Sequence, residues 1–312
     1  MNRDFQDDFG YKNVFCCDVL GGIMHKLLNL YINDLKLRNY SEKTIKSYRN
    51  ANLRFISYLE REGITDIDEV TSMQIKLYIQ SVDGKPSYIN ATIKRLRAWF
   101  VWLLEEEFIE RNPMAKIKLL RENKSVINTF SDTEAKRMMD AYDGNDILSI
   151  RNKTIIATLF GCGVRCSELL ELKLEDIKLD YLLIRNTKNK HDRVVPLHSQ
   201  LRKQLNRYLR ARKGFNSEYI FMSKNDLQLT VEAVERVVER CGVIAKVNPN
   251  IRCSPHTIRH YYCQYQLRNN VNIYSLSRIM GHSNIAITNR YLEGITNQQI
   301  IEESIGINPL NL

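Results

Sequence analysis

A proline at position 113, between two stretches with helical periodicity, most constrains how this chain can fold. The residue before a proline is pushed out of the α region, so Asn112-Pro113 must end the helix that precedes it. The following segment is polar and basic, as in a linker, and SDTE at 131–134 then matches a capping box that opens a new helix. We therefore expect a flexible tail at 1–22, a first domain at 23–112, a linker at 113–129 and a second domain at 130–312.

The first domain is expected to be helical. Ser41 is a good N-cap for a helix that reads SEKTIKSYRNANLRFISYLERE, since its hydroxyl can accept from an unpaired backbone N–H. Apolar side chains recur on one face of that helix, and Gly63 is a plausible stop. Further helices are expected at 71–82 and 87–109.

The second domain is expected to be mainly α, with a small β-hairpin. Two β-prone runs, 181–185 and 193–196, are separated by polar, turn-like residues, and a third short strand could occupy 219–222. The predicted helices of this domain are 132–142, 146–160, 167–172, 198–212, 230–244, 256–268, 273–280 and 284–292.

The overall composition favours a polyanionic partner and argues against several other classes. The formal net charge is +10, which suits phosphate contacts, although many basic proteins bind no acidic partner. Seven scattered cysteines lack metal-ligand spacing and indicate a reduced, cytoplasmic setting. No apolar run approaches the roughly 20 residues of a membrane span, so no membrane partner is expected. The absence of a phosphate-loop motif argues against an ATPase.

Two segments near the C-terminal end carry residues that no packing rule demands. The first, SPHTIRHYY, holds His256 and Arg259 one helical turn apart. The second, MGHSNIAITNRYL, holds His282 and Tyr291. An oxygen nucleophile, an arginine and two imidazoles together suit attack on a phosphodiester. A zinc site built on His256 and His260 would lack a third well-spaced ligand.

These segments resemble the H-x-x-R and G-H…Y motifs of the tyrosine recombinases, the phage integrase family. The family's upstream arginine segment is matched by LFGCGVRCSELLEL, which supplies Arg165 and Glu168. Its hairpin lysine is matched in RNTKNKHDRVVPL, where Lys188 is the candidate. The family's usual Gly-Lys-Gly is absent there, so Lys190 remains an alternative. The resemblance extends over residues 24 to 305.

The resemblance implies a role for each matched residue. Tyr291 would attack DNA and form a covalent 3′-phosphotyrosine, with Arg165 and Arg259 on the phosphate oxygens. His256 and His282 would contact the nucleophile or the phosphate, and Lys188 would protonate the leaving 5′-oxygen. Glu168 would orient Arg165. The strand exchange needs no metal and no cofactor, because the phosphotyrosyl link conserves the energy of the broken bond.

The same resemblance makes the first domain a core-binding, SAM-like DNA-binding domain. A charged helix face is otherwise usually only solvated. The predicted DNA contacts are Thr44, Lys46, Arg49, Asn90, Lys94, Arg95 and Arg97.

The implied function is site-specific DNA recombination, in integration, excision or resolution. The expected partners are double-stranded DNA with inverted-repeat core sites and three further copies of the chain, which make a homotetramer on two duplexes. An accessory DNA-bending or excision factor is an open option. The segment after Tyr291 could dock on a neighbouring protomer or on its own domain. Two alternatives remain, a type IB topoisomerase-like enzyme and a DNA-binding regulator that does not cleave.

Overall fold

The computed structural model describes residues 22–122, 127–185, 192–282, 284–289 and 291. It divides into two compact units, with the boundary between Lys124 and Ser125. Each unit has its own hydrophobic core. The predicted mainly α fold with a small hairpin is confirmed.

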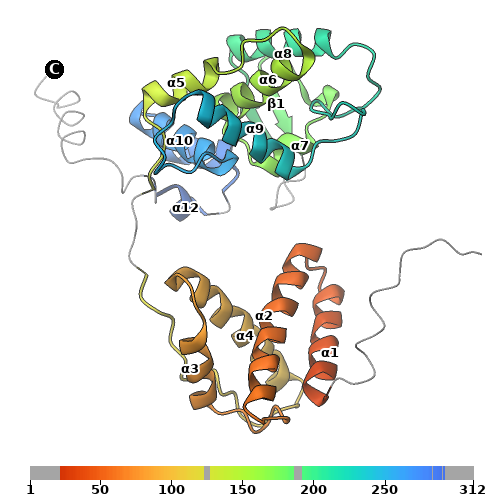
Figure 1. Ribbon diagram of the computed structural model, residues 1–312, viewed down its shortest axis with the longest axis vertical. Helices are drawn as coiled ribbons and strands as arrows, with labels where there is room; N and C mark the ends of the chain where they lie inside the picture. Colours follow the sequence, from red (N-terminus) through yellow and green to blue (C-terminus); the bar gives the residue numbers. More distant parts are fainter. Residues whose placement is uncertain (1–21, 123–126, 186–191, 283, 290, 292–312) are drawn as a thin grey trace, which may run out of the picture. The chain divides into compact units, whose positions relative to one another are not determined.

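Within its described residues, 22–122, the first unit contains four helices, coloured red to orange in Figure 1. They are α1 (Ile23–Leu37), α2 (Glu42–Arg61), α3 (Ser72–Ser81) and α4 (Pro86–Glu105). Ser41 caps α2 as expected, because its side chain accepts from the Thr44 amide. Gly63 follows α2 with φ at +78°, a conformation that costs a glycine little. Helix α1 was not among the predicted helices, and its N-terminus at Gly22 has no side-chain cap.

The segment after α4 covers one face of that helix. Met114 and Ile117 are buried in the core of the first unit. The Asn90 side chain both donates to the Leu120 carbonyl and accepts from the Leu120 amide. Residues 113–122 of the expected linker therefore pack against α4, and Asn90, one of the predicted DNA contacts, is buried there.

The second unit contains eight helices and one hairpin within its described residues (Figure 1). Helix α6 is central and is buried on several sides, since it packs against α5, α7, α8, α9 and α10. Its buried Thr154 and Thr158 hydroxyls donate to carbonyls one turn back, which satisfies them inside the core. The elements are α5 (Asp132–Asp140), α6 (Ile147–Cys162), α7 (Cys166–Glu171), a 3-10 turn η1 (Leu174–Asp176), β1 (Tyr181–Ile184), β2 (Arg193–Pro196), α8 (Ser199–Ala211), α9 (Val231–Ile244), α10 (Pro255–Arg268), α11 (Ile273–Met280) and α12 (Ile285–Asn289).

Strands β1 and β2 form an antiparallel pair in which Leu182 faces Val195. The run 219–222 forms no strand. Tyr219 and Met222 each make only an isolated bridge, to Lys173 and Gln228. The predicted capping box at α5 is present, because Ser131 accepts from the Glu134 amide and the Glu134 side chain accepts from the Ser131 amide. None of the described helices is long and apolar enough to cross a membrane.

Candidate active site

The centre of the candidate site is the buried carboxylate of Glu168 on α7. Helix α6 ends at Gly163 in the left-handed conformation, and α7 begins after Arg165, which is its N-cap residue. The Glu168 carboxylate accepts from the Arg165 backbone amide at 2.8 Å and from Arg165 Nη1 at 2.7 Å. The short link between two helices thus fixes Arg165 against Glu168.

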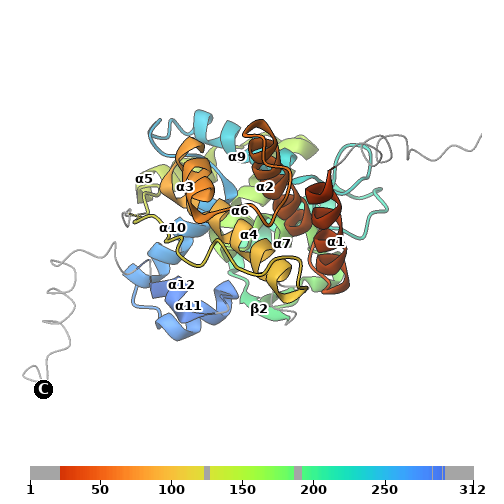
Figure 2. The same ribbon diagram turned by 90° about the horizontal axis from the view of Figure 1, so that it is seen from below.

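Arg193, the first residue of β2, binds the same carboxylate. Its Nη1 and Nη2 donate to the two Glu168 oxygens at 2.8 and 2.7 Å, the forked geometry that guanidinium allows. Its Nε donates to the Ile279 carbonyl of α11 at 2.7 Å. Strand β2 lies beside α11 (Figure 2). Arg193 therefore joins the hairpin, α7 and α11.

Arg259 on α10 is buried, and backbone carbonyls hold its guanidinium. It donates to the Gly163 carbonyl at 2.8 Å and to the Met280 carbonyl. Its Nη1 lies 3.9 Å from the Glu168 carboxylate. Arg165 Nη2 donates to the neighbouring Gly281 carbonyl at 3.0 Å. The two predicted arginines therefore both reach the turn that ends α11.

His282 and Tyr291 lie beside these arginines. His282 Nδ1 is 2.8 Å from the Thr288 hydroxyl, and the His282 ring is nearly parallel to the Tyr291 ring at a centroid distance of 6.4 Å. Tyr291 is buried in a small cluster with Tyr262, Leu276 and other apolar side chains. Its hydroxyl is 2.7 Å from His260 Nδ1. His256 lies one turn before His260 on α10, with a ring-centroid distance of 4.1 Å.

The cations in this site shift several pKa values. Burial and the nearby Arg259 and Arg165 guanidiniums lower the pKa of His282 to about 4. Partial burial, followed by the charge of Arg259, also lowers the pKa of His256. Burial and Arg165 lower the pKa of Arg259 to about 10, and the Tyr291 phenol acts electrostatically on the same guanidinium. The site therefore contains a high density of positive charge and disfavours a protonated His282.

Burial of Glu168 would by itself raise its pKa. The hydrogen bonds and charge of Arg193, with those of Arg165, outweigh this effect and lower the pKa to about 2. Glu168 therefore stays ionised at neutral pH and fixes the arginines.

The structure brings together five of the six predicted catalytic residues. These are Arg165, His256, Arg259, His282 and Tyr291. The predicted Lys188, its alternative Lys190 and the segment after Tyr291 lie outside the described residues. Among the described residues, no group of three or more His, Cys, Asp or Glu side chains could hold a metal.

Sequence reasoning missed two residues of this site, Arg193 and His260. Arg193 stands directly before the β-prone Val194-Val195 and carries no spacing signal of its own. His260 follows Arg259 immediately, and its helical spacing from His256 was the one available signal.

The predicted DNA contacts in the first unit fall into three groups. Lys46 and Lys94 are exposed. Asn90 is buried, Arg97 donates to the Ile117 carbonyl, and Arg49 donates to Asn29 of α1. The side chains of this second group serve internal contacts. Thr44 and Arg95 are half-buried.

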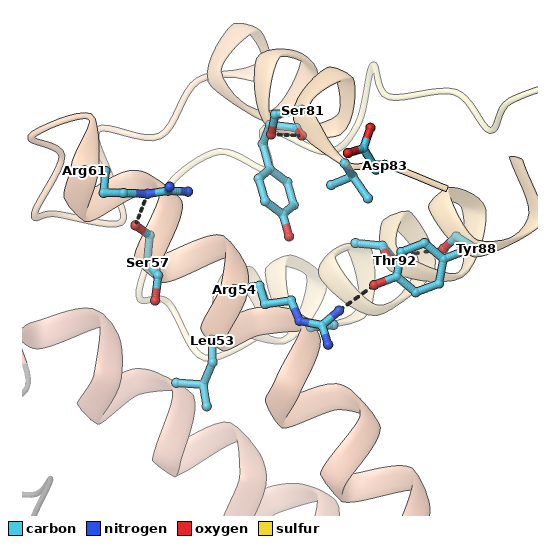
Figure 3. Close-up of a pocket in the computed structure, with 11 residues that line it drawn as sticks. Leu53, Arg54, Ser57, Arg61, Ser81, Asp83, Tyr88 and Thr92 are labelled. Atoms are coloured by element: carbon cyan, nitrogen blue, oxygen red, sulfur yellow. Dashed lines mark hydrogen bonds between the residues drawn. The ribbon is translucent and has the colours of Figure 1, made fainter. Parts of the chain in front are cut away.

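Helix α2 presents a row of exposed basic side chains that sequence reasoning recognised only at Lys46. Their spacing places them on one face of the helix. We call this row the α2 basic stripe, which comprises Lys43, Lys46, Arg54 and Arg61. Two of its members, Arg54 and Arg61, line a surface hollow of about 470 Å³ between α2, α3 and α4. There the Arg54 guanidinium donates to the Tyr88 hydroxyl and joins α2 to α4 (Figure 3).

Three guanidiniums thus meet around one carboxylate, and three imidazoles and a phenol lie beside them, an arrangement suited to a phosphodiester. Family comparisons agree with this chemistry. Residues 128–297 match the phage integrase family, and residues 28–107 match the phage integrase N-terminal SAM-like domain. The chain belongs to the phage integrase family of tyrosine recombinases, and it is an enzyme that cleaves and rejoins DNA strands.

Named relatives cover most of the chain. The tyrosine recombinase XerC of Bacillus pumilus (strain SAFR-032) is 27% identical over 280 residues, which cover 85% of this chain and 91% of the relative. A tyrosine recombinase of Pseudothermotoga lettingae is 25% identical over 272 residues, which cover 85% of this chain and 92% of the relative.

Solved structures share the fold. The XerH site-specific recombinase bound to a palindromic difH substrate has a TM-score of 0.73 at 17% identity, over 91% of this chain and 83% of that chain. A lambda integrase fragment bound as a dimer to a core site has a TM-score of 0.69 at 18% identity. The match covers 86% of this chain and 94% of that chain.

Proposed function

We propose that Tyr291 is the nucleophile of a site-specific recombination reaction. Its oxygen attacks the scissile phosphorus, the P–O5′ bond breaks, and the DNA is left with a 3′-phosphotyrosine and a free 5′-hydroxyl. The 5′-hydroxyl of the partner strand then attacks the phosphotyrosine and releases Tyr291. The observation that carries the proposal is the placement of Tyr291 beside His282, within electrostatic reach of Arg259.

Arg165 and Arg259 are proposed to bind the non-bridging phosphate oxygens. Attack on phosphorus builds negative charge on those oxygens, and preorganised guanidinium donors act where that charge develops. Backbone carbonyls and Glu168 hold both side chains before DNA binds. His256 and His282 are proposed to contact the same phosphate or the nucleophile. Lys188 is proposed to protonate the leaving 5′-oxygen.

A nicked suicide substrate tests the cleavage step. The short fragment downstream of the scissile bond diffuses away after cleavage, so the covalent protein–DNA complex accumulates. We expect wild type to form this complex and Tyr291→Phe to form none, with DNA affinity unchanged. Tyr274→Phe is the matched control, since Tyr274 is an exposed tyrosine on α11. Failure of wild type to form the complex, or its persistence in Tyr291→Phe, would contradict the proposal.

The first unit is proposed to contact DNA through the α2 basic stripe. The four side chains are exposed on one helix face, and the net charge of the chain is +10. Lysine and arginine contacts to phosphates supply most of the sequence-independent affinity for DNA. Lys94 on α4 is a further candidate contact, and Asn90 is not, because it is buried.

We further propose that four copies act on two duplexes, each duplex carrying inverted-repeat sites. The support comes from the family and from the solved structures of its members on DNA core sites. The reaction would take place on cytoplasmic DNA, and a mobile element is a candidate carrier, as in the transposon integrase of similar fold. Sedimentation of the protein with two site-bearing duplexes should give a four-protomer complex. Recombination by the purified protein alone would exclude a required accessory factor.

A further inference from the structure

His260 is the histidine whose described hydrogen bond reaches the hydroxyl of Tyr291. Its Nδ1 lies 2.7 Å from the phenol oxygen, and the two ring centroids are 5.3 Å apart. His260 is half-buried on α10, and Tyr291 is buried beside it. The contact joins residues 31 positions apart in the chain, so the tertiary fold creates it.

Attack by Tyr291 requires that its phenol lose a proton. An unperturbed phenol has a pKa near 10, so only about one molecule in a thousand is ionised at pH 7. A general base in hydrogen-bond contact removes this limitation, and it typically contributes about 10²–10⁴-fold in rate.

The other two histidines of the site are less suited to this step. His282 Nδ1 is already paired with the Thr288 hydroxyl, and its ring lies parallel to the Tyr291 ring. Burial and the adjacent arginines lower the pKa of His282 to about 4, which makes it a weak base. His256 is the more exposed histidine of α10, and it contacts the ring of His260.

We propose that His260 is a catalytic residue that accepts the Tyr291 proton at Nδ1. In this step the neutral imidazole carries its hydrogen on Nε2, the Tyr291 O–H bond breaks, and an N–H bond forms on Nδ1. The Tyr291 oxygen bonds to phosphorus, and the leaving 5′-oxygen takes its proton from the proposed acid Lys188. In rejoining, the 5′-hydroxyl gives its proton back to that lysine, and His260 returns its proton to Tyr291. The inference rests on the proposed role of Tyr291.

Two substitutions separate proton acceptance from simple positioning. His260→Ala removes both, whereas His260→Gln can still hold the phenol through an amide oxygen but is not a base at neutral pH. Single-turnover formation of the covalent complex on the nicked substrate should be about 10²–10⁴-fold slower in both variants. His25→Ala is the matched control, since His25 lies on α1 of the first unit and bonds to Glu60. Thermal melting and DNA affinity should match wild type.

A more acidic phenol provides a second measurement, and rescue of His260→Ala by it would also show that this variant is folded. Genetic incorporation of 3,5-difluorotyrosine at position 291 lowers the need for a base. It should therefore raise the rate of covalent-complex formation in His260→Ala at least tenfold. The same replacement should change the wild-type rate much less.

Three results would overturn the role of His260: a wild-type rate in His260→Gln, a faster reaction in His260→Ala, or equal effects of the fluorinated phenol in both backgrounds. A faster reaction would mean that the hydrogen bond only restrains Tyr291. Failure of the proposed function is distinguishable from this. In that case wild type would form no covalent complex, or Tyr291→Phe would still form one, and both results are obtained without any change at His260.

Discussion

One carboxylate organises the cations of the catalytic unit. Glu168 accepts hydrogen bonds from Arg165 and Arg193 and lies 3.9 Å from Arg259. A buried charge is tolerated only when it is paired and hydrogen-bonded, and removing one partner typically costs about 3–5 kcal/mol. The orientation of the two arginines proposed to bind phosphate therefore depends on Glu168, which touches no DNA in the proposed reaction.

Arg193→Met tests this dependence. We expect a loss of about 3 kcal/mol in the free energy of unfolding, because Glu168 loses its forked partner. Covalent-complex formation should also slow, since Arg165 is less firmly held. The surface variant Arg202→Met, which breaks an exposed pair with Asp180, should cost less than about 1 kcal/mol in the same denaturant titration. The double variant Glu168→Gln/Arg193→Met should lose less free energy of unfolding than the sum of the losses in the two single variants.

The depressed pKa of His282 gives the fold a defined response to acid. The pKa falls from an ordinary 6.5 to about 4 in the folded state, so between these values the unfolded chain binds the proton and the folded chain does not. Stability is therefore lost as the pH falls from about 6.5 to about 4. His256 shifts in the same direction. In His282→Asn, urea unfolding across this pH range should show a shallower decline; an unchanged slope would contradict the assignment.

At the scale of elements, two helix ends build the site. Helix α6 ends at Gly163 and α11 ends at Gly281, both in the left-handed conformation. The Gly163 carbonyl accepts from Arg259 and the Gly281 carbonyl accepts from Arg165. Left-handed glycines at helix ends are common, but here the carbonyls they expose also anchor the arginines.

Gly163→Ala should destabilise the catalytic unit by about 2 kcal/mol or more, because φ is +59° and non-glycine residues are strained there. An added Cβ would also lie 2.3 Å from Tyr262 Cδ1. Gly22→Ala is the control, since its φ is not positive and no atom lies within 4 Å of an added Cβ. Chemical denaturation measures both variants; equal stability would show that the turn adapts without strain.

The sequence was informative where chemistry or capping is local. Ser41, the capping box at α5 and the spaced histidine, arginine and tyrosine motifs all carry signals within a few residues. Helix α1 was not predicted because its N-cap residue, Gly22, provides no side-chain cap. The contacts of Asn90 and Arg193 were not predicted for another reason. Their partners are distant in the chain, at Leu120 and Glu168, and periodicity does not encode such contacts.

At the scale of the whole molecule, positive charge and binding chemistry occur in both units. The α2 basic stripe belongs to the first unit, and the arginine cluster belongs to the second. Affinity for DNA should accordingly fall steeply with salt, because each phosphate contact releases counterions.

The variants Lys43→Ala and Lys46→Ala test the contribution of the stripe. Each should lower the slope of log affinity against log salt by about 0.9, if each lysine contacts one phosphate. Lys76→Ala on α3 is an exposed lysine outside the stripe and should leave the slope unchanged. Fluorescence anisotropy with a site-bearing duplex at several salt concentrations measures all three. Equal slopes for stripe and control variants would place the DNA elsewhere.

The arrangement of three guanidiniums around the single carboxylate of Glu168 has a consequence for the resting protein. In the described part of the chain, three positive charges share this one carboxylate, an excess of two positive charges over it. Burial, followed by repulsion from Arg165, lowers the pKa of Arg259 to about 10. A bound phosphodiester supplies the missing anion, and any ligand that binds only the native state stabilises it. We therefore expect the DNA substrate to act also as a structural component, and the catalytic unit to be more stable when DNA is bound than in the resting protein.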